Sequence, residues 1–444
     1  MIWIELCILL ACILIGARLG GIALGTVSGI GLLIFVFALK EPPGGPPQLV
    51  IGMIIAVITA LAAMQAAGGL DYLVAIAEKV MRKHPRYITF VTPVATYLLV
   101  LGSGTTHVIY ALLPVIAEVS RKADVRPERP MSISVIAGFQ GVIASPISAA
   151  TVAMVGVLAA KDVSLPKLLA VTIPSTFLAV LIGALSVAWR GKPLSEDPEY
   201  QRRLATGELK PPQPTPAFRG KELFNARGAT ILFLVAILVI VVIGIFPNLV
   251  PEYQTVKNGI TDSDQASMGV VIMIIMIAVA GLTMIAFKAS PEVALKGSIM
   301  RGGVMAVISI IGVSWLGSSF FEGNRDYIVS SLSDMIRHYP WMFAAGLFVL
   351  SNLLFSAAAT VVIFMPLGLA LGLQPSHLIA FYLAANSVFF LPTYGTLLAA
   401  VSFDQTGTTK IGKYLLNHSF MLPGMVTVVT GIVIALALNA VIRP

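Results

Sequence analysis

Apolar segments follow one another along the whole chain, and no other feature constrains its fold as strongly. Hydrophobic residues make up 57% of the 444 positions and charged residues only 11%, and the mean hydropathy is +0.92. A soluble protein carries about twice that share of charge. The composition therefore predicts an all-α polytopic membrane protein, with apolar segments at 1–17, 20–39, 49–67, 88–119, 131–158, 167–189, 228–247, 268–287, 302–321, 341–372, 376–403 and 416–441.

The remaining composition excludes several classes of function. The net charge of +8 does not indicate nucleic-acid binding, because the basic residues are not gathered on a soluble domain. Cys7 and Cys12 have no metal-ligand spacing and are interpreted as packing residues. The first apolar segment has no basic residues before it, so we expect a retained span rather than a signal peptide. We find no nucleophile–base pair, metal-ligand cluster or phosphate-binding loop, and therefore expect no enzyme activity.

A polar hexapeptide at 102–107 separates two apolar runs, 88–101 and 108–119. Each run is shorter than the ~20 residues that a membrane-spanning helix needs. We therefore predict a re-entrant helical hairpin, which enters the bilayer partway and turns at a polar tip. The alternative is one long helix with a glycine-softened kink. Non-helical backbone at this depth is tolerated where it lines a watery cavity. The tip is thus a candidate binding site, made of Ser103, Gly104, Thr105, Thr106 and His107.

A polar stretch at 190–227, rich in charges and prolines, divides the chain. Such a segment cannot bury enough apolar surface to fold by itself, and we expect a cytoplasmic linker there. The parts on either side, 1–189 and 228–444, share landmarks at equal intervals: Asp71-Tyr72 recurs as Asp326-Tyr327, and Pro85 recurs as Pro340. An amphipathic segment lies between these landmarks in both parts, which predicts interfacial helices at 69–84 and 324–339. The chain is therefore predicted to contain two repeats.

Each repeat continues with a hairpin segment, 88–119 or 341–372, and then with an apolar span that is interrupted by proline. Proline inside a helix removes a hydrogen bond and clashes with the preceding turn. Each break alone fits a simple proline kink, but two breaks at matching places favour functional unwinding. The interrupted spans are 131–158 and 376–403, and their breaks are Ala144-Ser145-Pro146-Ile147-Ser148 and Leu391-Pro392-Thr393-Tyr394-Gly395-Thr396.

The predicted spans fix the topology. Each repeat has three scaffold spans (1–67 or 228–321), one broken span and one final span (167–189 or 416–441), which makes five crossings. Because five is odd, the second repeat must be inverted in the membrane. We predict ten spans, two hairpins and both termini on the periplasmic side, since this arrangement places most of the 29 lysines and arginines in the inside loops.

Hydroxyl and amide side chains gather at the broken positions of both repeats, whereas the predicted membrane interior holds no lysine or arginine. A half-helix that begins at mid-membrane directs free N–H groups and about half a positive charge at a ligand. Such ends suit a small anion with carboxylates at two positions, and Na⁺ or H⁺ would enter with it to balance its charge. His107 is a candidate ligand. His418 is better explained as an interfacial helix cap.

The chain resembles the anaerobic four-carbon dicarboxylate transporter (Dcu) family over essentially its whole length, and the A-type branch in particular. The segments that carry the likeness are GARLGGI at 16–22, MQAAGGLDY at 64–72, ASPIS at 144–148, LPTY at 391–394 and DQTGTTKIG at 404–412. The resemblance implies exchange, uptake and efflux of fumarate, succinate, malate and aspartate across the bacterial inner membrane in anaerobic respiration. It also implies the ion transporter superfamily, in which a transport domain moves like an elevator against a dimeric scaffold.

In that superfamily, hairpin tips and broken helices hold the substrate. The expected binding residues are therefore Ser103, Gly104, Thr105, Thr106, His107, Ser145, Pro146, Ser148, Ser356, Thr360, Asn386, Pro392, Thr393, Tyr394 and Thr396. The chain departs from the family pattern in three places. The first tip reads GSGTTH rather than GTG followed by Asn or His, and Gly395 replaces a usual proline. Alanines follow Ser356 where a glutamine is usual, so binding is expected to depend more on the first hairpin.

Two alternatives to plain transport stay open. A sodium/proton antiporter would need an intramembrane carboxylate, and the predicted spans offer none. The chain could instead regulate a sensor kinase, alone or alongside transport, through a contact surface at 190–227 or 404–413. The expectation of a homodimer rests on the resemblance alone.

Overall fold

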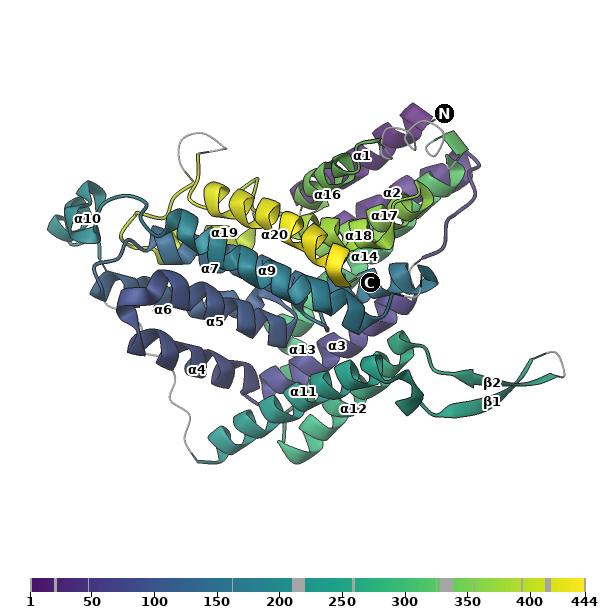
Figure 1. The fold of residues 1–444 in the computed structure, drawn as a ribbon, viewed down its shortest axis with the longest axis horizontal. Helices are drawn as coiled ribbons and strands as arrows, with labels where there is room; N and C mark the ends of the chain where they lie inside the picture. The colour runs from purple at the N-terminus through teal and green to yellow at the C-terminus, as the bar shows by residue number, and fades with distance from the viewer. Residues whose placement is uncertain are drawn as a thin grey trace.

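The structure of the protein is a computed structural model. It describes residues 2–19, 22–46, 48–161, 163–209, 220–257, 260–324, 326–327, 338–354, 356–392, 394–411 and 417–442. Figure 1 shows an assembly made almost entirely of packed helices, from which one β-hairpin projects. The predicted helical class is confirmed apart from this hairpin.

The chain begins with four helices: α1 (Ile2–Leu19), α2 (Ala23–Leu33, continued as a π-helix over Ile34–Ala38), α3 (Gln48–Ala66) and α4 (Gly69–Lys83). A bend of 71° separates α3 from α4. Gly68 permits this bend, because its φ of 82° is one that only glycine adopts without steric cost. The helix α4 is amphipathic, as predicted, and buries Leu70, Val74, Ala77 and Met81.

The next two helices, α5 (Ile88–Ser103) and α6 (Ile109–Lys122), form a helical hairpin around a short turn at Thr106–Val108. The end of α6 returns to the start of α5. Arg82, which precedes α5, pairs with Glu118 near the end of α6 at 2.9 Å. The segment is therefore two helices that reverse direction rather than one kinked helix.

The first broken span consists of α7 (Glu128–Ala144) and α8 (Ala149–Leu158), and α9 (Leu165–Val187) follows it. Nearly every residue of α7 is buried. It packs against α5 on one side and α9 on another. The helix α7 thus lies inside the assembly, with its broken end surrounded by protein.

The segment 190–227 is more ordered than the predicted linker. The helix α10 (Pro198–Ala205) lies inside this segment. The helix α11 (Lys221–Ile245) begins before residue 227, where the predicted linker ends. Part of the segment, 210–219, lies outside the described residues. The described part of the segment therefore contains helical structure, while its role as a cytoplasmic linker between the halves stays a prediction.

Local polar contacts explain why α10 forms. Asp197 caps the helix by accepting hydrogen bonds from two main-chain N–H groups of its first turn, and it also pairs with Arg126. The guanidinium groups of Arg202 and Arg203 lower the pKa of Glu199 to about 2. Caps and ion pairs one helical turn apart do not depend on a hydrophobic core, so a polar composition does not prevent them.

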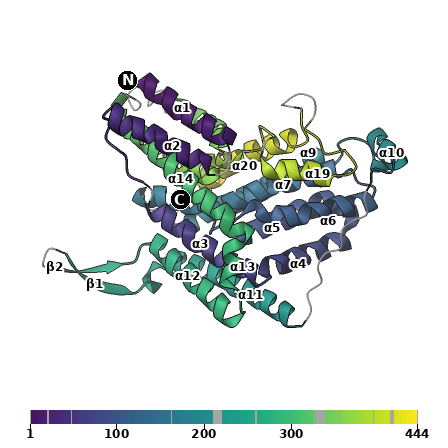
Figure 2. The ribbon, with the colours of Figure 1, turned by 180° about the vertical axis from the view of Figure 1, so that it is seen from behind.

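The second half of the chain begins with α11, and continues with α12 (Met268–Ala286), α13 (Pro291–Lys296) and α14 (Ser298–Gly323). Two antiparallel strands, β1 (Glu252–Lys257) and β2 (Ile260–Gln265), lie between α11 and α12. The prediction of an all-α chain is wrong at this point. Figure 2 shows the two strands extending away from the helices beside one end of α12. The predicted interfacial helix at 324–339 falls largely outside the described residues.

The last third of the chain repeats the pattern of short and broken helices. A second hairpin segment comprises α16 (Trp341–Leu354) and α17 (Ala357–Ala370). The second broken span comprises α18 (Pro375–Phe381), the 3-10 helix η7 (Tyr382–Asn386) and α19 (Gly395–Phe403). The final helix α20 (Met421–Ile442) packs against α9, and Figure 1 shows the two running side by side.

Five helical segments of the described chain are long and apolar enough to cross a membrane, and α3 with α4 gives a sixth if that bent pair counts as one span. The five are Glu128–Leu158, Leu165–Val187, Lys221–Ile245, Met268–Ala286 and Met421–Ile442. Shorter apolar helices accompany them, including Trp341–Asn352 and Ala357–Ala370. These segments fit a polytopic membrane protein, while the ten predicted spans stay a prediction.

One helix pair in the assembly makes an unusually close contact. A Cβ added at Gly312 on α14 would overlap the main-chain atoms of Gly25 on α2. The two helices therefore meet backbone to backbone. Both figures place α1, α2 and α14 together at one side of the molecule, and α4, α5 and α6 together at another.

Candidate binding site at the helix breaks

The tip of the first hairpin lies against the first broken span. The helix α5 ends at Ser103, and Gly104 follows with a φ of 68°. A Cβ added at Gly104 would lie 3.1 Å from the Ile147 side chain, which belongs to the break between α7 and α8. Glycine is therefore required at 104 by its backbone conformation and also by its close neighbour. The predicted tip and the predicted break are thus in contact.

The break between α7 and α8 is held by its own hydroxyl groups. Ser148 caps α8 by accepting a hydrogen bond from the Thr151 N–H at 3.1 Å. Thr151 Oγ1 in turn donates to the Ile143 carbonyl at 3.2 Å, near the end of α7. By contrast, the Ser145 hydroxyl is fully buried and has no hydrogen-bond partner within the described chain. Of the two predicted serines, Ser145 is the one whose hydroxyl is left for a ligand.

Hydroxyl side chains also hold the start of α17 in the second hairpin. Ser356 caps α17 by accepting from the Ala359 N–H at 3.2 Å. The Thr360 hydroxyl donates to the Ser356 carbonyl at 2.8 Å. These two predicted binding residues therefore satisfy the backbone of their own helix, which is the usual role of hydroxyl side chains in membrane helices.

Polar side chains of α16 support the extended chain after η7. Ser351 Oγ accepts a hydrogen bond from the Ser387 N–H at 3.2 Å, and Asn352 Oδ1 accepts one from the Leu391 N–H at 3.3 Å. The predicted binding residue Asn386 donates from Nδ2 to the Phe139 carbonyl on α7 at 2.7 Å. Backbone groups that the broken helix cannot satisfy are thus satisfied by side chains of neighbouring helices.

The start of α19 reaches the tip of the first hairpin. The Tyr394 hydroxyl hydrogen-bonds the Thr106 side chain. The Tyr394 ring also packs edge-on against Phe139, with ring centroids 5.5 Å apart. At Gly395, a Cβ would overlap the hydroxyl oxygen of Tyr110 on α6. The departure from the family's usual proline at 395 therefore coincides with a tyrosine that fills this space.

Several buried polar atoms near these breaks have no hydrogen-bond partner in the described part of the chain. Buried polar groups without a partner are uncommon in proteins and call for an explanation such as a ligand, an ion or water. They are Ser145 Oγ, Ser387 Oγ, Thr396 Oγ1 and both amide atoms of Gln140. The side chain of His107 and the whole of Thr393 lie outside the described residues. Pro146 and Pro392 are buried at their breaks.

Sequence reasoning missed Gln140 and Tyr382. Gln140 is the one amide side chain within 131–158, and this contrast with its apolar neighbours was the available signal. Tyr382 is fully buried, and its hydroxyl lies 3.0 Å from Thr151 Oγ1. No local pattern marks this contact, because it joins residues that are 231 positions apart.

The interpretation of His418 as an interfacial cap is wrong. Its side chain is buried, and Nε2 lies 3.2 Å from the carbonyl oxygen of Phe390 in the second break. Since a carbonyl only accepts, Nε2 carries the proton and donates it. The next residue, Ser419, donates to the Glu128 carboxylate at 2.9 Å. The second break is thereby tied to the start of α7.

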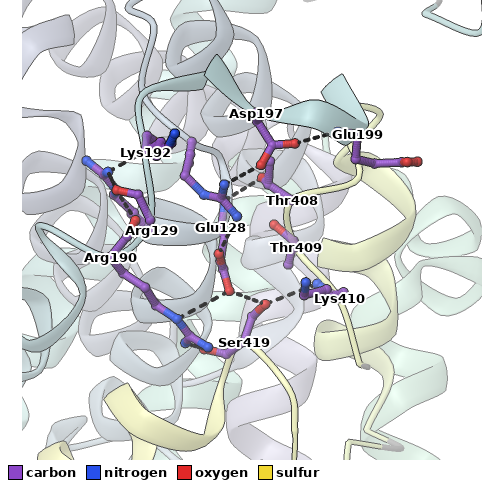
Figure 3. Close-up of polar contacts among 12 residues, drawn as sticks. Glu128, Arg129, Arg190, Lys192, Asp197, Glu199, Thr408, Thr409, Lys410 and Ser419 are labelled. Atoms are coloured by element: carbon purple, nitrogen blue, oxygen red, sulfur yellow. Dashed lines mark hydrogen bonds and ion pairs between the residues drawn. The ribbon is translucent and has the colours of Figure 1, made fainter. Parts of the chain in front are cut away.

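Glu128 is the centre of a polar cluster at one end of the helices, shown in Figure 3. It is buried and receives Arg126 at 3.1 Å and Arg190 at 3.5 Å. Its main-chain N–H donates to Thr408 Oγ1 at 3.1 Å, which holds residues 404–411 of the predicted motif against α7. Because carboxylates and guanidinium groups are matched here, we interpret the cluster as a structural anchor and not as an anion site.

A cavity of about 120 Å³ adjoins the first tip. It lies between the tip and α8 on one side and α3 and α14 on the other, and its lining includes Leu61, Gly104, Thr105, Ile147, Val152 and Ile299. The described residues contain no group of three or more His, Cys, Asp or Glu side chains that could hold a metal ion. The groups that the site offers to a ligand are therefore side-chain hydroxyls, side-chain amides and the main-chain N–H groups at helix starts.

The family of the chain is shown by comparison with known proteins. The family model described as anaerobic C4-dicarboxylate membrane transporter matches residues 1–443. The chain belongs to this family. The predicted family is thus confirmed, and its members are transporters rather than enzymes.

Relatives within this family cover nearly the whole chain. The chain is 40% identical to the C4-dicarboxylate transporter DcuA of Escherichia coli (strain K12), over 99% of both chains. It is 40% identical to DcuA of Wolinella succinogenes, over 100% of this chain and 99% of the relative. It is 37% identical to the anaerobic C4-dicarboxylate transporter DcuB of Escherichia coli O6:H1, over 96% of this chain and 95% of the relative.

A solved structure supports the fold. MtrF of Neisseria gonorrhoeae, which is described with a class of antimetabolite efflux pumps, matches with a TM-score of 0.55. The match covers 91% of this chain and 84% of MtrF, at 14% sequence identity. At this identity the likeness concerns the fold alone.

Proposed function

We propose that this family member is a secondary active transporter that exchanges C4-dicarboxylates across the bacterial inner membrane. The expected substrates are fumarate, succinate, malate and aspartate, and the names of the DcuA and DcuB relatives support this class. The observation that carries the proposal is the meeting of the first hairpin tip with both broken spans, at Gly104 against Ile147 and at Thr106 against Tyr394.

The chemistry of the meeting point suits a dicarboxylate. The first N–H groups of a helix have no partner within it and attract an anion. The helices α8 and α19 begin here, and the hydroxyls of Ser145 and Thr396, which have no partner among the described residues, lie beside their first turns. A dianion needs more positive charge than helix ends supply, so Na⁺ or H⁺ would enter with it. Cation-coupled uptake is therefore proposed as a second mode beside exchange.

The proposed mechanism is an elevator. In it, two inverted repeats of five spans form ten spans with both termini periplasmic, and the hairpins re-enter the membrane. The hairpins and broken spans would move together against the first three spans of each repeat. The cavity beside Gly104 supports this division, because it separates the tip from α3 and α14. The protein would work as a homodimer. A regulatory contact with a sensor kinase is a further role that the family suggests.

Reconstitution tests the proposal. Proteoliposomes containing the purified protein and internal fumarate should accumulate labelled succinate, and empty liposomes should not. Replacing Thr105 and Thr106 together with alanine should reduce this exchange to roughly one-tenth or less, since each lost hydrogen bond to a ligand costs about 1 kcal/mol or more. Thr430 on α20 bonds only to its own helix, so Thr430→Ala is the control. Equal exchange in empty liposomes, or unchanged exchange in the double variant, would contradict the proposal.

Repeating the uptake with and without a sodium gradient, and then with and without a proton gradient, separates the two couplings. Accumulation that follows only the sodium gradient would assign Na⁺. Accumulation that follows only the pH gradient would assign H⁺. If the exchange responds to neither gradient, cation-coupled uptake is refuted and only the exchange of dicarboxylates stays proposed.

A further inference from the structure

We propose that Tyr382 is a positioning residue for substrate binding: it fixes the start of α8 from the opposite half of the chain. The inference rests on the proposed function and deepens it. Tyr382 is the first residue of η7, in the second broken span, whereas α8 belongs to the first broken span. The hydroxyl of Tyr382 lies 3.0 Å from Thr151 Oγ1.

The direction of these hydrogen bonds follows from the capacity of a hydroxyl group, which has one donor and two acceptor positions. Thr151 Oγ1 donates to the Ile143 carbonyl at 3.2 Å, and it accepts from Ser148 Oγ at 3.0 Å. Its remaining position is an acceptor. The Tyr382 hydroxyl must therefore be the donor, and it completes the hydrogen bonding of Thr151.

Thr151 is the point at which the two ends of the break are joined. Its side chain bonds the end of α7 at Ile143, while its main-chain N–H bonds the cap residue Ser148 of α8. Holding the Thr151 side chain in place therefore sets the direction of α8 and the position of the main-chain N–H groups at the start of α8. Ser145, whose buried hydroxyl has no partner in the part of the chain that the structure describes, lies inside the same turn. Tyr382 therefore determines where the proposed ligand groups lie, without touching the substrate.

Tyr97 provides a matched control. It is 1% exposed, compared with 0% for Tyr382. Its hydroxyl also bonds a threonine side chain, Thr176 Oγ1, at 2.8 Å, and it donates to the Ile173 carbonyl at 3.1 Å. This contact joins α5 to α9 and involves neither break. Replacing either tyrosine with phenylalanine removes one buried hydroxyl and leaves the ring in place.

The experiment measures succinate–fumarate exchange and thermal unfolding for the wild type, Tyr382→Phe and Tyr97→Phe. Both variants should unfold at a lower temperature, because each loses a buried hydrogen bond. Only Tyr382→Phe should raise the KM for succinate, by roughly fivefold, which corresponds to about one hydrogen bond. Its kcat should change by less than about twofold, since no group that contacts the substrate is removed. An unchanged KM in Tyr382→Phe, or an equal rise in Tyr97→Phe, would overturn the inference.

A second pair of variants keeps the test decisive if Tyr382→Phe does not fold. Thr151→Ser retains the hydroxyl and should keep the wild-type KM, whereas Thr151→Val removes it and should raise the KM as Tyr382→Phe does. Equal KM values for Thr151→Ser and Thr151→Val would overturn the inference. A wild type that exchanges no dicarboxylate would instead refute the proposed function, so the two failures are distinguishable.

Discussion

Asn386 and Phe139 join the two halves of the chain at the candidate site: Asn386 Nδ2 donates to the main-chain oxygen of Phe139 at 2.7 Å. Asn386 ends η7 in the second broken span, and Phe139 lies on α7 in the first. Both groups are buried. The hydrogen bond therefore holds the two broken spans in a fixed relation, and the non-helical segment 387–392 starts directly after Asn386.

Replacing Asn386 with alanine should raise the KM for dicarboxylate exchange by roughly tenfold, because a buried carbonyl loses its donor and η7 loses its anchor. Exchange kinetics in proteoliposomes measure the effect. Asn439 is the control: it is also 6% exposed and donates to a carbonyl, that of Ser376, at 2.6 Å. Asn439→Ala should lower the unfolding temperature and keep the wild-type KM. The same KM in both variants would contradict the prediction.

Ser145 and Ser148 should respond differently to alanine substitution. Ser148 caps α8, and loss of such a cap costs about 0.5–2 kcal/mol of stability. The Ser145 hydroxyl is buried without a partner in the described chain, so its removal should leave stability unchanged or raise it. It should nevertheless raise the KM several-fold. Thermal unfolding and exchange kinetics check the two effects separately. A large loss of stability in Ser145→Ala would show that its hydroxyl has a structural role instead.

His418 should be replaceable by glutamine but not by alanine. The Phe390 carbonyl needs a donor at the position of Nε2, and a glutamine amide can supply one at a similar reach. We expect His418→Gln to retain at least half of the exchange rate and His418→Ala to lose most of it. Initial rates at saturating substrate check this. If glutamine fails as completely as alanine, the hydrogen bond to Phe390 is not what His418 contributes.

Asp197 should control the order of α10. It caps the helix and pairs with Arg126, so Asp197→Ala should loosen α10 and speed trypsin cleavage at Arg202 and Arg203. Asp197→Asn keeps the capping oxygen but loses the charge, and should give an intermediate rate. Timed digestion in detergent checks the order. Dicarboxylate exchange should stay unchanged in both variants, because α10 lies outside the candidate site.

Sequence reasoning found the positions at which glycine and proline interrupt the helices. Gly104 and Pro146 act through their own backbone geometry, so a single sequence is enough to locate them. It also found α4, because amphipathic spacing is a local property. The structure brings these positions together, and their role as a substrate site stays a prediction. The partners across the site were not predictable, since Thr106 with Tyr394, and Thr151 with Tyr382, depend on how distant segments pack.

The differences from the prediction have physical reasons as well. The linker was not expected to fold by itself because its composition cannot form a core, and α10 is held by a cap and by Arg126 from another segment. The hairpin of β1 and β2 did carry a local signal, the Asn258-Gly259 dipeptide, which favours tight turns between strands. Ser148, Ser356 and Thr360 stay predicted binding residues, and each of them also bonds the backbone of its own helix, as hydroxyls at helix starts often do.

The contact between Gly25 and Gly312 restricts how this molecule can change shape. Neither residue has a side chain, so the backbones of α2 and α14 are in direct contact with no adjustable group between them. We expect these two helices to move, or to stay in place, as one body during a transport cycle. The displacement has to be taken up along surfaces with adjustable side chains, and the apolar lining beside Gly104 is such a surface.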